Sequence, residues 1–132
     1  MARPNRFRRS LGSSQMLRFW RATINSGRGL LFAFRSEQAF REEVVALLVG
    51  VPLALLIGMT PARRIELVIV ILLLVVIELL NTAIEKLSDR LTLDHDPQIR
   101  TVKDLGSAAV GVMIVVAGLT WLFAIAERLG II

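Results

Sequence analysis

The sequence has no cysteine, no tyrosine and only one histidine, His95. A disulfide scaffold, a cysteine zinc site, an iron–sulfur cluster and a cysteine nucleophile are therefore excluded. The glycine-rich phosphate loops of soluble nucleotide-binding proteins are also missing, as are the G-x-S-x-G and H-E-x-x-H motifs. Chemistry in this chain has to come from carboxylates, lysine, arginine, asparagine, serine and threonine.

Hydrophobic residues are abundant. They make up 55% of the 132 residues, whereas 20% are charged. Soluble domains are about 45–50% apolar, and one domain of this length could hardly bury the surplus. The formal net charge is +5, and fourteen of the sixteen basic residues are arginine. The composition predicts an all-α membrane protein with a single domain.

The N-terminal part is strongly basic. Residues 1–15 hold four arginines and no acid, and they predict a mobile basic tail. Residues 16–35 place arginines on one side of a helix and Trp, Phe and Leu on the other, the pattern of an amphipathic helix at a bilayer surface. Gly27 and Gly29 weaken that helix by about 1 kcal/mol each and predict a break near them.

Three apolar runs follow and predict membrane spans at about 43–60, 65–88 and 105–127. A spanning helix needs about 20 mostly apolar residues. With three spans, thirteen lysines and arginines lie on the side of the N-terminus and three on the other. The positive-inside rule then places the N-terminus in the cytoplasm and the C-terminus outside. The arginines flank membrane spans rather than a soluble module, so nucleic-acid binding is not expected.

The second span carries four polar residues at helical spacing: Glu78, Asn81, Glu85 and Asp89. On a helix they form one polar stripe. An acid inside a span costs at least about 2.5–3.5 kcal/mol, so it marks a functional site by default. The alternative is a structural patch that joins helices through Asn81. Glu78 and Glu85 are about 10 Å apart along the axis, which favours separate roles.

The loop after this span contains further polar residues. His95 lies between Asp94 and Asp96, an arrangement that fits a metal ligand less well than a solvated loop. Lys103 is suited to contact a phosphate, and Asp104 stands where it would cap a helix starting near Leu105. The acids before the first span are typical of interfacial anchors.

Three segments resemble the bacterial integral-membrane diacylglycerol kinases. They are Glu37-x-Ala39-Phe40-Arg41-x-Glu43, Glu78-x-x-Asn81-Thr82-Ala83-Ile84-Glu85-x-x-x-Asp89-Arg90 and Lys103-Asp104-x-Gly106-Ser107-Ala108-Ala109-Val110. The resemblance extends from about Arg18 to Ala126. It implies a homotrimer of three-span subunits, each with an N-terminal surface helix, in the bacterial inner membrane. Such a trimer phosphorylates diacylglycerol with Mg-ATP at the cytoplasmic interface and gives phosphatidate.

The same resemblance implies the site residues. Glu78 matches the general base, Glu37 and Glu85 match magnesium ligands, and Asn81 and Asp104 match catalytic polar residues. Nucleotide contacts are implied for Arg18, Asn25, Glu37, Glu85, Asp89, Asp94, His95, Asp96, Lys103 and Asp104. Substrate contacts are implied for Arg18, Glu78 and Ser107. The chain departs from the family in its longer arginine-rich tail and in Asn25-Ser26-Gly27, where relatives place aromatic residues.

Three other functions compete with this one. An undecaprenol kinase has a similar motif pattern, although Gly106-Ser107-Ala108-Ala109 looks more like the diacylglycerol branch. A small proton-coupled transporter would use Glu78 as its intramembrane carboxylate, but it would not need four further charged residues at one membrane face. A non-catalytic membrane scaffold is the third, and Mg-dependent ATP turnover with added lipid separates all of them.

Overall fold

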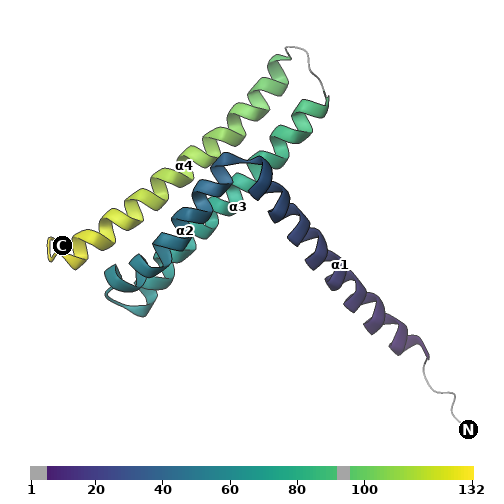
Figure 1. The fold of residues 1–132 in the computed structure, drawn as a ribbon, viewed down its shortest axis with the longest axis horizontal. Helices are drawn as coiled ribbons and strands as arrows, with labels where there is room; N and C mark the ends of the chain where they lie inside the picture. Colours follow the sequence, from purple (N-terminus) through teal and green to yellow (C-terminus); the bar gives the residue numbers. More distant parts are fainter. Residues whose placement is uncertain (1–5, 92–95) are drawn as a thin grey trace, which may run out of the picture. The chain divides into compact units, whose positions relative to one another are not determined.

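A computed structural model describes residues 6–91 and 96–132, and every regular element in that part of the chain is an α-helix (Figure 1). The helices are α1 (Arg6–Ser36), α2 (Gln38–Ile57), α3 (Pro61–Leu91) and α4 (Pro97–Arg128). The chain divides into two compact units, Met1–Ser36 and Glu37–Ile132. The all-helical class predicted from the sequence is confirmed.

Helix α1 forms the first unit and is longer than the sequence suggested. It begins at Arg6, so residues 6–15 are helical where a mobile tail is predicted, and residues 1–5 lie outside the described part. The predicted break is wrong, because α1 continues through Gly27 and Gly29. Two glycines cost about 2 kcal/mol in helix propensity, which does not interrupt the backbone hydrogen bonds of a 31-residue helix.

Helices α2, α3 and α4 form the second unit as two successive antiparallel hairpins, with α3 between α2 and α4 (Figure 1). Ala54, Leu67 and Ala124 are fully buried where the three helices meet, and Trp121 packs against them. Small residues at this point let the helix backbones approach closely. The core of the unit is thus narrow and lies along α3.

The register between α2 and α3 is fixed at three levels. Near the α2–α3 turn Ala54 and Leu67 share one buried cluster, and further along α2 a side chain on Gly50 would collide with Ile71. Beyond both, Glu37 forms an ion pair with Lys86. Helices α2 and α3 are therefore antiparallel, and each residue back along α2 corresponds to one residue forward along α3.

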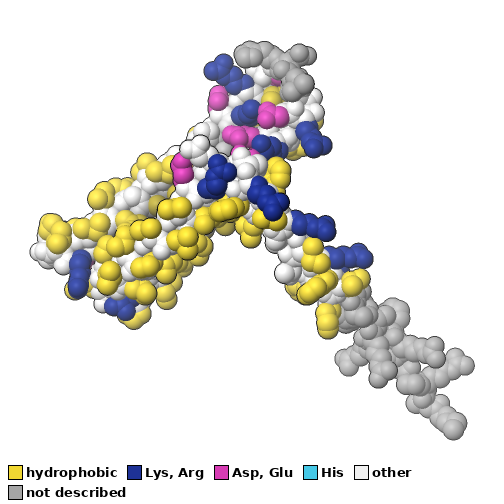
Figure 2. All heavy atoms as spheres, viewed as in Figure 1, with side chains coloured by type: hydrophobic (Ala, Val, Ile, Leu, Met, Phe, Trp, Pro, Cys, Tyr) yellow, Lys and Arg dark blue, Asp and Glu magenta, His cyan; other side chains and the backbone are white. Residues whose placement is uncertain are grey.

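The outside of the second unit is apolar. Figure 2 shows hydrophobic side chains over the α2–α4 bundle, with charged side chains gathered toward its ends. Helices α3 and α4 are each long and apolar enough to cross a membrane, and most of the apolar stretch of each is exposed. Monomeric soluble proteins rarely expose an apolar surface of this extent to water. The structure therefore indicates a membrane protein.

Two candidate spans are found in the described residues, and the predicted count of three is not confirmed. Helix α2 has only 20 residues, against 31 in α3 and 32 in α4, and Arg41, Glu42 and Glu43 lie within its first turns. Its uncharged part starts only at Val44 and ends with the helix at Ile57.

Helix α4 begins earlier than the apolar run predicted. Asp96 is its N-cap and accepts hydrogen bonds from the backbone N–H groups of Gln98 and Ile99, with Pro97 in the first turn. The expectation that Asp104 caps this helix is wrong. Asp104 lies inside α4 and is 3.9 Å from Arg100. Asp followed by Pro is a strong helix start in any solvent, so the helix begins in the polar loop, before the apolar residues.

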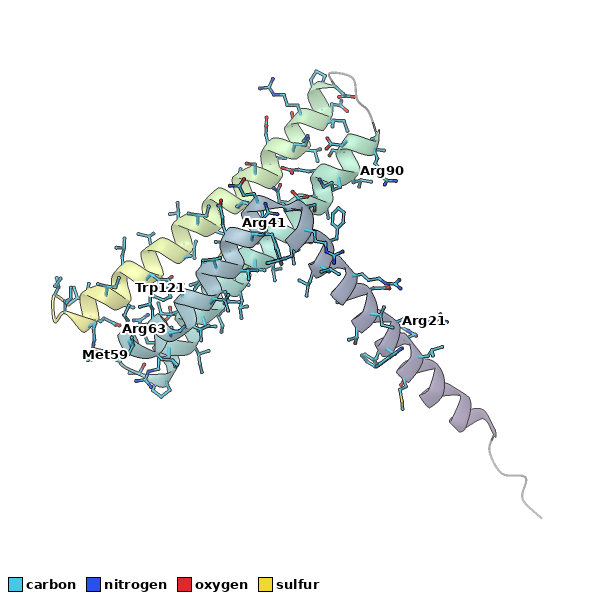
Figure 3. The ribbon with its side chains drawn as sticks, in the orientation of Figure 1. Arg21, Arg41, Met59, Arg63, Arg90 and Trp121 are labelled. Carbon is cyan, nitrogen blue, oxygen red and sulfur yellow. The ribbon has the colours of Figure 1, made fainter. Side chains whose placement is uncertain are left out.

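The end of the bundle formed by the α2–α3 turn is held by one arginine. Arg63 donates to both carboxylate oxygens of Glu127, at 2.8 and 2.7 Å, and lies 2.6 Å from Glu66. Its guanidinium also lies 5.4 Å from the centre of the Phe123 ring. Figure 3 shows Arg63 and Met59 at this end and Arg90 at the other. A paired, ring-stacked arginine ties α3 to α4 here.

Candidate active site

The candidate site lies at the end of the bundle where α2 and α4 begin and α3 ends. Its framework is the polar stripe of α3. Glu78 and Asn81 are each 8% exposed, Glu85 is half-buried and Asp89 is exposed. The stripe thus runs from the apolar interior to the polar end of the bundle. The predicted common helix face is confirmed.

Asn81 is the centre of this stripe. Its amide Nδ2 donates to Oε1 of Glu85 at 3.3 Å. Its Oδ1 is buried and accepts no hydrogen bond within the described part of the chain. Gly106 of α4 packs directly on that oxygen, because a Cβ at this position would collide with it. An unsatisfied buried carbonyl oxygen is costly, and it is an acceptor available to a ligand.

Two ion pairs tie the neighbouring helices to α3. Glu37, the N-cap residue of α2, makes no capping hydrogen bond with its side chain and instead lies 3.0 Å from Nζ of Lys86. On the other side, Nζ of Lys103 donates to Asp89 at 2.9 Å. That hydrogen bond, with the charges of Asp89 and Glu85, raises the pKa of Lys103 above its ordinary value. Lys103 therefore remains a cation at physiological pH.

Glu43 is a site residue that the sequence interpretation missed. Its side chain is 8% exposed, and its Oε2 is buried with no hydrogen-bond partner among the described residues. Its charge interacts with that of Glu78. Helical spacing could have identified Glu43 from the sequence. The buried face of α2 is formed by Phe40, Glu43, Gly50 and Ala54. Lys86 and Gly106 were missed as well.

Some predicted residues do not converge with this group. The Asp96 side chain serves as a helix cap, Asp104 is exposed beside Arg100, and Ser107 is exposed on α4. Arg18 and Asn25 belong to the separate α1 unit, so their place in the site stays a prediction. Asp94 and His95 lie outside the described residues.

The oxygen chemistry of the site is suited to magnesium. No three acidic or histidine side chains converge on a metal position within the residues described. However, Mg²⁺ in kinases usually takes one or two carboxylates and completes its shell with phosphate oxygens and water. Glu37 and Glu85 both interact electrostatically with Glu78, and the neighbouring Asn81, which donates to Glu85 through Nδ2, carries an Oδ1 with no hydrogen-bond partner among the described residues. Hard oxygen donors of this kind and number fit the ion.

Comparison with known proteins points to one family. The family model described as "Prokaryotic diacylglycerol kinase" matches residues 24–125. A diacylglycerol kinase of Pseudomonas aeruginosa is 40% identical over 110 residues, covering 83% of this chain and 89% of the relative. That of Escherichia coli K12 is 35% identical over 113 residues (86% and 93%). An undecaprenol kinase of Bacillus subtilis is 31% identical over 107 residues (79% and 85%).

Proposed function

Because this chain belongs to the prokaryotic diacylglycerol kinase family, we propose that it transfers the γ-phosphoryl group of Mg-ATP to the hydroxyl of 1,2-diacylglycerol, giving phosphatidate. One structural observation supports this proposal in addition to the family match. A buried carboxylate and amide, Glu78 and Asn81, continue along one helix face into a cluster of paired charges. A lipid hydroxyl at the bilayer boundary and a nucleotide in water both have access to such a stripe.

The proposed division of roles follows depth along α3. Glu78, the deepest of the four, accepts the proton of the lipid hydroxyl as general base. Lys103 is a permanent cation at the polar end and contacts a phosphate, alongside Asp89. Asn81 connects the two levels through its hydrogen bond to Glu85. Phosphoryl transfer depends chiefly on positioning and charge neutralisation, and this set of residues supplies both.

Glu37 and Glu85 are the proposed magnesium ligands. Bound there, the ion would bridge phosphate oxygens and neutralise their charge. Lys86 now balances Glu37 at 3.0 Å, and a cation at Glu37 would release this ammonium toward phosphate. Further nucleotide and lipid contacts are proposed for Arg18, Asn25, the Asp94–Asp96 loop, Asp104 and Ser107, on the family resemblance alone.

We propose three spans, with α2 as the first. Helix α2 starts beside Lys86 near the polar end of α3 and ends at the turn that begins α3. It has 20 residues, or about 30 Å, which matches the thickness of the bilayer core. If α3 crosses the bilayer, α2 crosses the same depth beside it. The charge asymmetry supports a cytoplasmic N-terminus in the bacterial inner membrane, and the resemblance supports a homotrimer.

The test is a reconstituted assay. Purified protein in lipid vesicles receives Mg-ATP and 1,2-diacylglycerol, and phosphatidate is measured by thin-layer chromatography with labelled ATP. We expect product that depends on magnesium and forms about 10²–10⁴-fold more slowly in Glu78→Gln. The absence of phosphatidate, with the protein folded, would refute the proposal.

Undecaprenol kinase is the second candidate, and the Bacillus subtilis relative is the observation that favours it. The same assay with a polyprenol in place of diacylglycerol separates the two. We expect diacylglycerol to give the higher kcat/KM, because the relatives at 35–40% identity carry the diacylglycerol kinase name. A preference for the polyprenol would transfer the assignment to this candidate.

A further inference from the structure

The register of α2 against α3 brings a second carboxylate opposite Glu78. Gly50 and Ile71 are in direct contact across the two helices. Seven residues make nearly two full helical turns, so Glu43 occupies the same face of α2 as Gly50, and Glu78 the same face of α3 as Ile71. The helices are antiparallel, so one step of seven along each leads to facing positions. Glu43 and Glu78 therefore oppose each other.

Both residues are largely shielded from water. Each residue is 8% exposed, and the charges of the two carboxylates interact. Oε2 of Glu43 has no hydrogen-bond partner in the described part of the chain, although a buried carboxylate oxygen normally has one. A proton held between the two groups would satisfy this oxygen.

The charged groups around the pair are already engaged with one another. From α2, Glu37 pairs with Lys86 of α3, and Glu37 and Glu85 both add negative charge near Glu78. From α4, Lys103 is hydrogen-bonded to Asp89. Two opposed carboxylates that are sheltered from water cannot both remain ionised, and one proton between them removes the repulsion.

We propose that Glu43 and Glu78 share one proton and that Glu43 is the positioning residue of the general base. The role of Glu78 in this statement rests on the proposed kinase function. The protonated carboxyl of Glu43 donates a hydrogen bond to the Glu78 carboxylate and fixes its orientation. When the lipid O–H bond breaks, its proton passes to Glu78, and the pair changes from one proton and one negative charge to two protons and none. Release of one proton to water restores the starting state.

The pair itself is tested by infrared spectroscopy of the full-length protein in lipid vesicles, with ¹³C-labelled glutamate to identify carboxyl bands. At neutral pH we expect the C=O band of one protonated glutamic acid in the unchanged protein. The band should disappear in Glu43→Gln, because Glu78 then ionises without a facing charge. The control is Glu42→Gln, the same change at the exposed neighbour, which should keep the band.

The positioning role is tested by kcat as a function of pH. We expect Glu43→Gln to lower kcat about tenfold or more, while KM for ATP changes less than twofold. The unchanged enzyme should lose activity at alkaline pH as the shared proton leaves, and Glu43→Gln should lack that alkaline decline. Glu43→Asp, which retains an acid, should restore the decline and part of kcat.

Three results would overturn the inference: no protonated glutamate band in the unchanged protein, a band that survives Glu43→Gln, or a kcat lowered equally at every pH. The infrared measurement uses no lipid substrate, so it judges the pair even if diacylglycerol is not phosphorylated. Failure of the unchanged enzyme to phosphorylate diacylglycerol counts against the proposed function only.

Discussion

Glu78 and Glu85 lie on the same helix face but in different surroundings. Glu78 is 8% exposed, whereas Glu85 is half-buried and hydrogen-bonded to Asn81. We expect Glu78→Gln to lower kcat by about 10²–10⁴-fold, the usual contribution of a general base, with nearly unchanged nucleotide affinity. Glu85→Gln should weaken Mg-ATP use instead, and Glu85→Asp should recover part of it at high magnesium. The measurement is kcat and KM for ATP across a magnesium titration.

Direct nucleotide binding to each variant serves as the companion experiment. Loss of nucleotide binding in Glu78→Gln with full kcat at saturation would exclude Glu78 as the base. If both substitutions were kinetically silent, the stripe would be structural.

Gly106 is required by its size. Its α-carbon lies so close to Asn81 that a methyl group would displace the Asn81 side chain and break its contact with Glu85. We expect Gly106→Ala to lower kcat up to about 100-fold, the effect of moving a catalytic group by an ångström. Gly111→Ala is the matched control, since among the described residues no atom outside its own stretch of α4 lies within 4 Å of a Cβ there. Equal activities of the two variants would show that Asn81 is not held by this contact.

The sequence predicted the four stripe residues of α3 and also Glu37 and Lys103 on the neighbouring helices, but it missed Glu43, Lys86 and Gly106. Helical periodicity alone puts Glu78 and Asn81 on one face, and the cost of a buried acid marks Glu78. Glu43 belongs to the first segment that resembles the family, but its position after Arg41 and Glu42, at the edge of an apolar run, is typical of an interfacial anchor. Its burial depends on how α2 slides along α3, and this is decided by contacts such as Gly50 on Ile71.

The connection between α3 and α4 at the turn end depends on Arg63. Its two hydrogen bonds to Glu127 join residues 64 positions apart. We expect Arg63→Ala and Glu127→Ala each to lower the midpoint temperature of thermal unfolding in detergent, and the double variant to lose less than the sum of the two. Kinase activity should change little, because these residues lie at the far end of the bundle. Strict additivity would mean that the pair contributes nothing to stability.

Helix boundaries were harder to predict than helices. Apolar runs indicated the helices, including α3 and α4. An apolar run marks the part of a helix that contacts lipid, however, and does not show where the helix begins or ends. Asp96 and Pro97 start α4 in the polar loop, and α1 extends back to Arg6 through residues expected to be a tail. The predicted span at 43–60 indicated α2 as well, but the helix already begins at Gln38, before the charges of its first turns, and ends at Ile57.

The distribution of basic residues predicts how the molecule lies in the membrane. The N-terminus should be cytoplasmic and the C-terminus external, because thirteen of the sixteen basic residues would then face the cytoplasm. The sequence has no cysteine, so Ser13→Cys and Ile132→Cys each introduce a unique label site. In intact spheroplasts, an impermeant thiol reagent should modify position 132 and spare position 13.

Permeabilised cells provide the control, in which both positions should react. Equal labelling of both ends in intact spheroplasts would mean an even number of spans, and α2 would then not cross the bilayer.

The short connection at residues 58–60 affects the geometry of the candidate site, although it lies at the opposite end of the bundle. It lies about 26 Å along α3 from Glu78, at 1.5 Å per residue, yet its length has to agree with the packing of Gly50 on Ile71 that keeps Glu43 opposite that carboxylate. One alanine inserted after Met59 would shift α2 by one position, a rotation of about 100°, and turn Glu43 away while altering no side chain of the site. We expect that insertion to abolish activity, whereas an alanine inserted after Gly130, beyond α4, should be tolerated. Insertions and deletions in this connection would thus abolish a reaction at the opposite end of the bundle.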